Sequence, residues 1–363
     1  MRAVYLPSLA LVLASMAAVT PGDPPYRVAV VSESGDIVTW LNPTATGLEV
    51  DRVVPVGIMP SDIDGPHNIT VSPDGASYYV TVAHGTPFGS LWKMDTRRDS
   101  LLGRAQVELF PTTIALTPDG QFAFVANSDF HGDHPRTNLV SVVHTPTMTK
   151  ITDIPACDMP HGVKANHAGN RVYVSCMHSD EILEVDVGTL SLTRRAATGD
   201  AEGPHPSSTH HSAGCSPTFV SVSPDDKRLY VACNSGNSLQ VWDAGSFKRI
   251  KEIRVGTGAY NVEPSPDGKL VIVTNKKDQS ISLIDAVGLT ELARVATSKK
   301  IVHGVAYSPD GRRAYISCES IGIDPGAVDV IDLATRKRVA TVAIPGQPTG
   351  ITVLPSHATS ARH

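Results

Sequence analysis

The chain has 363 residues and a formal net charge of −5, with no long run of a single charge. Nucleic-acid binders carry a basic patch or stripe, so this charge distribution excludes that class and we expect no nucleic-acid partner. Glycine (29 residues) and proline (27 residues) are plentiful, whereas aromatic residues make up 5% of the chain. That composition is typical of many short strands joined by turns.

Residues 1–25 are expected to be a secretory signal peptide and a short linker. Arg2 supplies a basic start, an apolar run covers residues 3–18, and small residues near Ala18 suit cleavage. The run is too short for a membrane span, and no later segment reaches the roughly 18 continuous apolar residues that a span needs. We therefore expect a soluble exported protein, periplasmic or secreted, without a membrane span.

A turn phrase recurs along the rest of the chain and marks a repeat of about 40 residues. It first appears as Ser72-Pro73-Asp74-Gly75, and proline, aspartate and glycine each favour a tight turn. A short strand precedes the phrase, an apolar strand follows it, and two more strands complete each unit. Four strands in a repeat of this length are typical of a β-propeller blade. The later copies begin at Thr117, Ser223, Ser265 and Ser308.

Six blades begin near residues 66, 111, 160, 217, 259 and 303. A seventh blade is split between the two ends of the chain, because residues 26–57 supply three strands and residues 349–353 supply a lone first strand. Pairing these ends closes the ring and leaves no open sheet edge. We therefore predict an all-β fold: one seven-bladed β-propeller with four-stranded blades over residues 26–356. Residues 357–363 are expected to be a disordered tail, and the protein a monomer.

The repeats resemble those of a known family. Residues 271–275 read Val-Ile-Val-Thr-Asn and residues 230–234 read Tyr-Val-Ala-Cys-Asn, and each is followed by a strand that ends in aspartate. These residues resemble the YVTN-repeat (YncE-like) family of seven-bladed β-propellers, over nearly the whole chain after the leader. The resemblance implies the fold but says little about activity, because this scaffold carries many functions. It also implies one hypothesis about function, in which the protein is a non-enzymatic binding scaffold of the cell envelope.

Three histidines open the first strand of their blades and carry the main functional hypothesis. They are His67, His161 and His303, in blades two, four and seven of the predicted ring. His84 and His178 follow the histidine of their own blade at one identical spacing, at the end of the second strand. The start of strand one and the end of strand two share a face of a propeller. These side chains are therefore predicted to meet at one mouth of the central channel.

Imidazole nitrogen is a common ligand of copper, iron and zinc. We predict a transition-metal site with His67, His161 and His303 as ligands and with His84 and His178 in support, copper being the first choice and iron or zinc the alternatives. Further candidates on the same face are His131, His134, His205, His210, His211, Glu319 and Cys318. A second interpretation stays open, in which each strand-opening histidine hydrogen-bonds a carbonyl at the rim and residues 199–216 form a solvated loop.

The cysteines map to the same face. Export to an oxidising compartment favours disulfides, so we predict the pairs Cys157–Cys176 and Cys215–Cys233, each joining a blade's entry loop to its second strand. Cys318 is left over, and two interpretations remain for it: a small buried residue, or a thiolate ligand or redox-active thiol. There is no Cys-x-x-Cys-His sequence, so no c-type haem is expected.

Three functions remain open at this point. The first is an exported metal-binding propeller, acting as a copper- or iron-dependent redox enzyme with a small-molecule substrate. The second is a non-enzymatic scaffold of the cell envelope that binds another protein through its loops. The third is a metal-assisted lactonase or other hydrolase. Glu263 is noted as either a channel carboxylate or a partner of Lys276 or Lys277.

Overall fold

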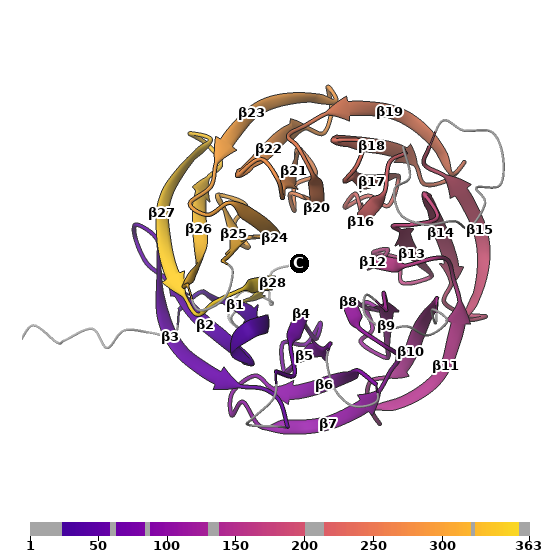
Figure 1. Ribbon diagram of the computed structural model, residues 1–363, viewed down its shortest axis with the longest axis horizontal. Helices are drawn as coiled ribbons and strands as arrows, with labels where there is room; N and C mark the ends of the chain where they lie inside the picture. The colour runs from indigo at the N-terminus through magenta and orange to yellow at the C-terminus, as the bar shows by residue number, and fades with distance from the viewer. Residues whose placement is uncertain are drawn as a thin grey trace, which may run out of the picture.

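The computed structural model describes residues 24–58, 63–83, 88–129, 138–199, 214–320 and 324–355. Within these ranges the chain forms seven four-stranded antiparallel sheets, arranged as the blades of a ring around a central axis (Figure 1). The predicted all-β, seven-bladed propeller is confirmed. No helix among the described residues is long and apolar enough to cross a membrane. The predicted signal peptide, apart from its last two residues, and the tail lie outside the described residues.

Each blade is read from its innermost to its outermost strand. Blade 1 holds β28 (Pro348–Pro355), β1 (Tyr26–Ser32), β2 (Ile37–Pro43) and β3 (Leu48–Pro55), and blade 2 holds β4 (Pro66–Val71), β5 (Ser77–Val82), β6 (Ser90–Asp95) and β7 (Leu101–Gln106). Blade 3 holds β8 (Pro111–Leu116), β9 (Phe122–Asn127), β10 (Leu139–His144) and β11 (Thr149–Pro155), and blade 4 holds β12 (Pro160–Ala165), β13 (Arg171–Cys176), β14 (Glu181–Asp186) and β15 (Ser191–Ala197). Blade 5 holds β16 (Pro217–Val222), β17 (Arg228–Cys233), β18 (Ser238–Asp243) and β19 (Lys248–Arg254). Blade 6 holds β20 (Ala259–Pro264), β21 (Leu270–Asn275), β22 (Ser280–Asp285) and β23 (Thr290–Ala296), and blade 7 holds β24 (Ile301–Tyr307), β25 (Arg313–Glu319), β26 (Gly326–Asp332) and β27 (Lys337–Ile344).

The ring closes through the two ends of the chain, as the split repeat predicts. β28 pairs antiparallel with β1, with Thr352 opposite Ala29 and Leu354 opposite Arg27. This pairing joins the last strand to the first three, so the inner sheet edge of blade 1 is covered. A short 3-10 helix, η1 (Glu33–Gly35), follows β1. Glu33 therefore lies at the end of β1, which is the second strand of blade 1 counted from the axis.

The recurring turn phrase forms the hairpin between the first and second strands of a blade. In blade 2 the amide of Gly75 donates to the carbonyl of Ser72 at 2.8 Å, and Gly75 has a φ of 68°, which glycine adopts without strain. The Ser72 hydroxyl donates to the Asp74 carboxylate at 2.5 Å, and the amide of Ala76 donates to the same oxygen. These hydrogen bonds lower the pKa of Asp74. The phrase therefore encodes the hairpins on the face opposite the strand-one histidines.

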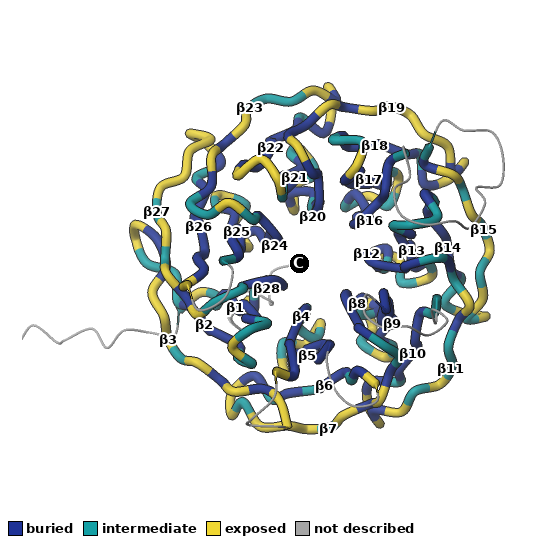
Figure 2. The backbone as a smooth tube through the Cα atoms, in the orientation of Figure 1, coloured by how far each residue is buried: buried dark blue, intermediate teal, exposed yellow. Residues whose placement is uncertain are grey.

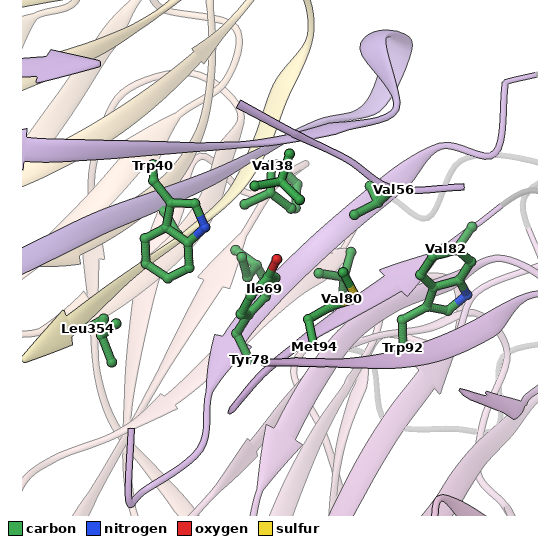
Figure 3. Close-up of a cluster of buried hydrophobic side chains, with 13 residues drawn as sticks. Val38, Trp40, Val56, Ile69, Tyr78, Val80, Val82, Trp92, Met94 and Leu354 are labelled. Atoms are coloured by element: carbon green, nitrogen blue, oxygen red, sulfur yellow. The ribbon is translucent and has the colours of Figure 1, made fainter. Parts of the chain in front are cut away.

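Apolar side chains fill the spaces between adjacent blades, and the inner strands are buried while the outer strands are exposed (Figure 2). Figure 3 shows the cluster between blades 1 and 2, where Trp40 lies edge-on to Tyr78 at 5.3 Å between ring centroids. Burial of these apolar surfaces fixes one blade against the next. The channel lining is consequently rigid, and side chains from separate blades converge there.

Both predicted disulfides are present in the structure. Cys157–Cys176 lies in blade 4 and Cys215–Cys233 in blade 5, with Cα atoms 5.9 and 4.5 Å apart. Each joins the segment before the innermost strand to the end of the second strand. Cys318 is a free, buried cysteine. Its thiol lies 3.5 Å from Asp329 Oδ2, and burial raises its pKa well above the ordinary value, so it is a protonated core residue.

Candidate ligand site at the channel mouth

The first strands of all seven blades line the channel (Figure 1), and the three strand-opening histidines lie buried on β4, β12 and β24. His67 and His303 contact each other edge to face, with ring centroids 5.3 Å apart. Tyr260, at the equivalent position of β20, contacts His303 at 4.7 Å and His161 at 5.4 Å. The structure thus brings two of the three histidines together and places a tyrosine between them and the third.

Two of the three histidines, His161 and His303, are held by a short motif that joins neighbouring blades. In blade 4 the His161 Nδ1 donates to the carbonyl of Thr218 in blade 5 at 2.8 Å. The next amide, of Gly162, donates to the Ser175 hydroxyl, which in turn donates to the same Thr218 carbonyl. A Cβ on Gly162 would lie 2.7 Å from the Cα of Phe219, so only glycine permits this approach of the two strands.

The motif repeats at His303 in blade 7. The amide of Gly304 donates to the Ser317 hydroxyl at 2.7 Å, and that hydroxyl donates to the carbonyl of Thr349 in blade 1. A Cβ on Gly304 would lie 2.8 Å from Ser317 Oγ, from the Thr349 oxygen and from the side chain of Ile351. The sequence His-Gly on strand one with serine on strand two therefore fixes the histidine at the channel.

His161 uses both of its ring nitrogens within the protein. Its Nδ1–H donates to Thr218, so its Nε2 carries the lone pair and accepts from the Tyr260 hydroxyl at 3.1 Å. Burial, with a smaller contribution from the nearby His67, lowers the pKa of His161 to about 3. His161 is therefore a neutral, fully hydrogen-bonded residue, as the rim interpretation expects of a strand-opening histidine.

Within the described part of the chain, His67 leaves one ring nitrogen without a hydrogen-bond partner, and His303 leaves both. His67 Nδ1 lies 2.8 Å from Glu33 Oε2, and a carboxylate only accepts, so the proton of neutral His67 sits on Nδ1 and Nε2 presents a lone pair. Nε2 of His67 and Nε2 of His303 are both buried, with no hydrogen-bond partner among the residues described. Burial, and next the charge of Lys276, lower the pKa of His303 well below its ordinary value, so it is neutral.

Three charged residues surround this pair of histidines. Glu33, Lys276 and Glu319 occupy one equivalent position, at the end of the second strand, in the adjacent blades 1, 6 and 7. Lys276 Nζ lies 3.0 Å from Glu319 Oε1 and 4.1 Å from the centre of the Tyr260 ring. Burial alone would lower the pKa of Lys276, but Tyr260 and the carboxylates of Glu319 and Glu33 outweigh it and raise the pKa. Lys276 is therefore an ammonium at this mouth.

We define the channel-mouth cluster as His67, His303, Glu33, Lys276, Glu319 and Tyr260. His67, His303 and Glu319 were predicted at this mouth from their positions in the repeat. Glu33, Lys276 and Tyr260 were not predicted, although the register that they share with Glu319 or with the histidines could have identified them. Glu263 is a channel carboxylate, but its partner is Lys164, at 2.7 Å, together with the Ser221 hydroxyl.

The remaining predicted site residues are either described elsewhere on the fold or lie outside the described residues. His178 is partly exposed after β13, and its Nδ1 lies 3.9 Å from Asp158 Oδ2. Six further candidates lie outside the described residues, and the structure gives them no place: His84, His131, His134, His205, His210 and His211.

A transition metal fits the cluster only in part. The unused Nε2 atoms of His67 and His303 are suitable ligands, and Glu319 Oε1 lies 3.8 Å from His303 Nε2. Lys276, however, already places a positive charge 3.0 Å from that same oxygen. Within the ranges that the structure describes, no group of three or more His, Cys, Asp and Glu side chains is arranged to hold a metal ion.

The sequence matches the YNCE-like beta-propeller family over residues 4–359, nearly the whole chain. The chain belongs to the YNCE-like β-propeller family. A relative from Mycobacterium tuberculosis (strain ATCC 25618 / H37Rv), the seven-bladed β-propeller protein Rv1057, is 30% identical. That match covers 64% of this YNCE-like chain and 63% of the relative, so the chain spans less than two thirds of the relative's length. The family resemblance read from the repeats is confirmed.

Solved structures share the YNCE-like propeller fold at low sequence identity. The periplasmic gluconolactonase PpgL of Pseudomonas aeruginosa superimposes with a TM-score of 0.72 at 17% identity, covering 91% of this chain and 99% of that chain. Hydrazine synthase of Kuenenia stuttgartiensis gives a TM-score of 0.66 at 22% identity, covering 82% of this chain and 94% of that chain. At these identities the likeness establishes the fold alone.

Proposed function

We propose that this YNCE-like propeller is an exported protein that binds a small, neutral, hydroxyl-bearing molecule at the channel-mouth cluster. The observation that carries the proposal is the pair of unused Nε2 atoms on His67 and His303. A buried polar atom without a partner costs about 1–3 kcal/mol, and in native proteins such atoms are few. A ligand that hydrogen-bonds both nitrogens would remove that cost.

The charges of the cluster select the chemistry of the ligand. The cluster holds two carboxyl groups, those of Glu33 and Glu319, and one ammonium, that of Lys276. This balance disfavours an anion. The lone pair of His67 requires a donor, which a hydroxyl group supplies, and the Lys276 ammonium offers donors to a carbonyl or ether oxygen. Sugars, polyols and hydroxylated lactones combine these groups.

Two further points support this class of ligand. His67, Glu33 and Lys276 keep 9%, 13% and 28% of their side chains exposed, so the cluster is not completely enclosed by protein. A periplasmic gluconolactonase shares the fold, and a hydroxylated lactone belongs to the class that the cluster selects.

Calorimetric titration tests the proposal. The neutral probes are D-sorbitol and D-glucono-1,5-lactone, with D-gluconate as the charged counterpart of the second. We expect the neutral probes to bind and His303→Ala to weaken their binding about tenfold, the value of one good hydrogen bond. His178→Ala is the matched control, because it removes a partly exposed histidine outside the cluster. Absence of binding, or equal binding by His303→Ala, contradicts the proposal.

A transition metal is the second candidate, favoured by the same two nitrogens and their 5.3 Å ring separation. His67 and His303 would hold copper, iron or zinc, with Glu33 fixing the His67 ring through Nδ1. A bound metal would supply Lewis-acid or redox chemistry. Elemental analysis of untagged protein beside the His67→Ala/His303→Ala double variant decides the question. Stoichiometric metal that the double variant lacks would replace the organic-ligand proposal.

Export is proposed from the cysteines. The structure contains two disulfides. Cysteines in a reducing cytoplasm stay as free thiols, whereas an oxidising compartment maintains disulfide bonds. We expect the native protein in the periplasmic or extracellular fraction with one free thiol after unfolding. Recovery in the cytoplasmic fraction with five free thiols contradicts export.

A further inference from the structure

We propose that His67 and Glu33 form a general-base dyad that activates water for hydrolysis of a small neutral ester or lactone bound at the channel-mouth cluster. This inference rests on the proposed ligand site and adds a reaction to it. The geometry that carries it is the 2.8 Å contact between His67 Nδ1 and Glu33 Oε2, together with the unused Nε2 on the other side of the ring.

The dyad has the two properties that a general base requires. Glu33 holds the imidazole in the tautomer that exposes the Nε2 lone pair, and it stabilises the imidazolium that forms when Nε2 takes a proton. Both partners come from rigid elements, since Glu33 begins η1 directly after β1 and His67 lies on β4. The two side chains are 9% and 13% exposed, so the dyad is almost completely shielded from bulk solvent.

The other two histidines are not suited to this role. His161 Nε2 is occupied by the Tyr260 hydroxyl. His303 lies beside the Lys276 ammonium, which with burial holds its pKa well below the ordinary value and disfavours a proton on it. His303 can still orient a hydroxyl of the ligand. Among the three strand-opening histidines, His67 alone combines a carboxylate on Nδ1 with an unused Nε2.

Lys276 supplies a positive charge that stabilises the negative charge developing on the carbonyl oxygen during the reaction. It faces His303 from blade 6, while His67 contacts the same ring from blade 2. Its ammonium forms an ion pair with Glu319, and N–H groups that do not point to Glu319 can donate to a carbonyl oxygen of the ligand. A preorganised donor aimed at a developing oxyanion is a large contribution to acyl-transfer catalysis.

The reaction balances without another reagent. His67 Nε2 takes a proton from water as the water oxygen bonds to the carbonyl carbon, and the π electrons move to the carbonyl oxygen beside Lys276. The tetrahedral intermediate then collapses, the carbonyl re-forms, and the bond to the alcohol oxygen breaks. His67 returns the proton to that oxygen. The products are a carboxylic acid and an alcohol, or one hydroxy acid when the substrate is a lactone.

Steady-state hydrolysis of D-glucono-1,5-lactone and of p-nitrophenyl acetate tests the dyad, with spontaneous hydrolysis subtracted. We expect His67→Ala to lower kcat by about 10²–10⁴, the usual range for a general base, and added imidazole to restore part of the rate. His67→Asn, which can still hydrogen-bond Glu33, provides a folded inactive variant if His67→Ala does not fold. Glu33→Gln, at the positioning residue, should lower kcat while KM stays within about twofold. His178→Ala is the control and should match the wild type.

The outcomes separate the reaction from the binding site. Turnover that falls in the His67 variants and recovers with imidazole supports the dyad. Wild type that binds D-sorbitol but hydrolyses neither probe, or His67 variants that hydrolyse them at the wild-type rate, overturns the dyad and leaves the ligand site standing. Failure to bind D-sorbitol and D-glucono-1,5-lactone overturns the ligand site and the dyad together.

Discussion

The ion pair between Lys276 and Glu319 offers a quantitative test of how the channel mouth is built. The Lys276→Met variant keeps most of the side-chain volume but removes the ammonium that lies 3.0 Å from Glu319 Oε1. Glu319 is only 9% exposed, so the variant leaves a nearly buried carboxylate without its counter-charge. Removing one partner of a buried pair costs about 3–5 kcal/mol, and the 28% exposure of Lys276 places the expected loss near the lower end.

A loss of about 3 kcal/mol corresponds to a fall of about 4 °C in Tm for a chain of this size, from an unfolding entropy of about 2 cal/mol/K per residue. The double variant Lys276→Met/Glu319→Gln removes both charges, and we expect it to lose less than about 1 kcal/mol. The two changes should therefore couple by at least about 2 kcal/mol in a double-mutant cycle. Urea unfolding and calorimetry of the four proteins at pH 7 provide the measurement.

A second lysine in the channel serves as the matched control. Lys164 pairs with Glu263 at 2.7 Å, but the two side chains are 35% and 29% exposed, so solvent screens this pair. We expect Lys164→Met to cost about 1 kcal/mol or less. If Lys276→Met costs no more than Lys164→Met, or if the cycle is additive, the assignment of Lys276 as the counter-charge of the nearly buried Glu319 is wrong.

Three further predictions follow from other parts of the site. The folded-state pKa of His161 is about 3 against an ordinary 6.5, so the unfolded chain binds the extra proton between these values. The unfolding free energy of the wild type should therefore fall by up to about 1.4 kcal/mol per pH unit below pH 6.5, and that of His161→Gln should fall less steeply. Equal slopes for the two proteins in urea unfolding at pH 7, 6 and 5 would refute this. Replacing Cys215 and Cys233 by serine opens a link between residues 18 positions apart and should cost about 3 kcal/mol in thermal unfolding, whereas an unchanged Tm would show that the bond contributes nothing. Gly304→Ala should lower the free energy of unfolding by about 1–3 kcal/mol and weaken D-sorbitol binding, because the added Cβ would lie 2.8 Å from three atoms. Gly199→Ala is the control, because its added Cβ would have no atom within 4 Å, and it should change neither quantity. Equal effects of the two variants would contradict the packing argument.

The fold was predictable because its signals are local. The turn phrase at Ser72–Gly75 and its copies place the hairpins, and the predicted blade starts near residues 66, 111, 160, 217, 259 and 303 agree with the observed starts of β4, β8, β12, β16, β20 and β24 within two residues. The pairing of β28 with β1 follows from counting strands, because an incomplete first blade needs a fourth strand.

The site was predictable only in part because it depends on side-chain directions and on the order of blades. The register of His67 and His303 placed them at one mouth, but only the structure shows that His161 turns to the Tyr260 hydroxyl. Glu33 and Lys276 lie far apart in sequence, and closure of the ring is what brings blade 1 beside blade 7, which is next to blade 6. A search limited to histidines could not find them.

The most direct test of the central claim reads the ring nitrogens of His67 and His303 by ¹⁵N NMR in histidine-labelled protein, assigned with single His→Gln variants. The account predicts a proton on Nδ1 and none on Nε2 of His67, and a shift of the Nε2 resonances of His67 and His303 when D-sorbitol is added. The resonances of His178 should not move. A proton on Nε2 of neutral His67, or Nε2 resonances that stay unchanged at saturating D-sorbitol and D-glucono-1,5-lactone, would contradict the account.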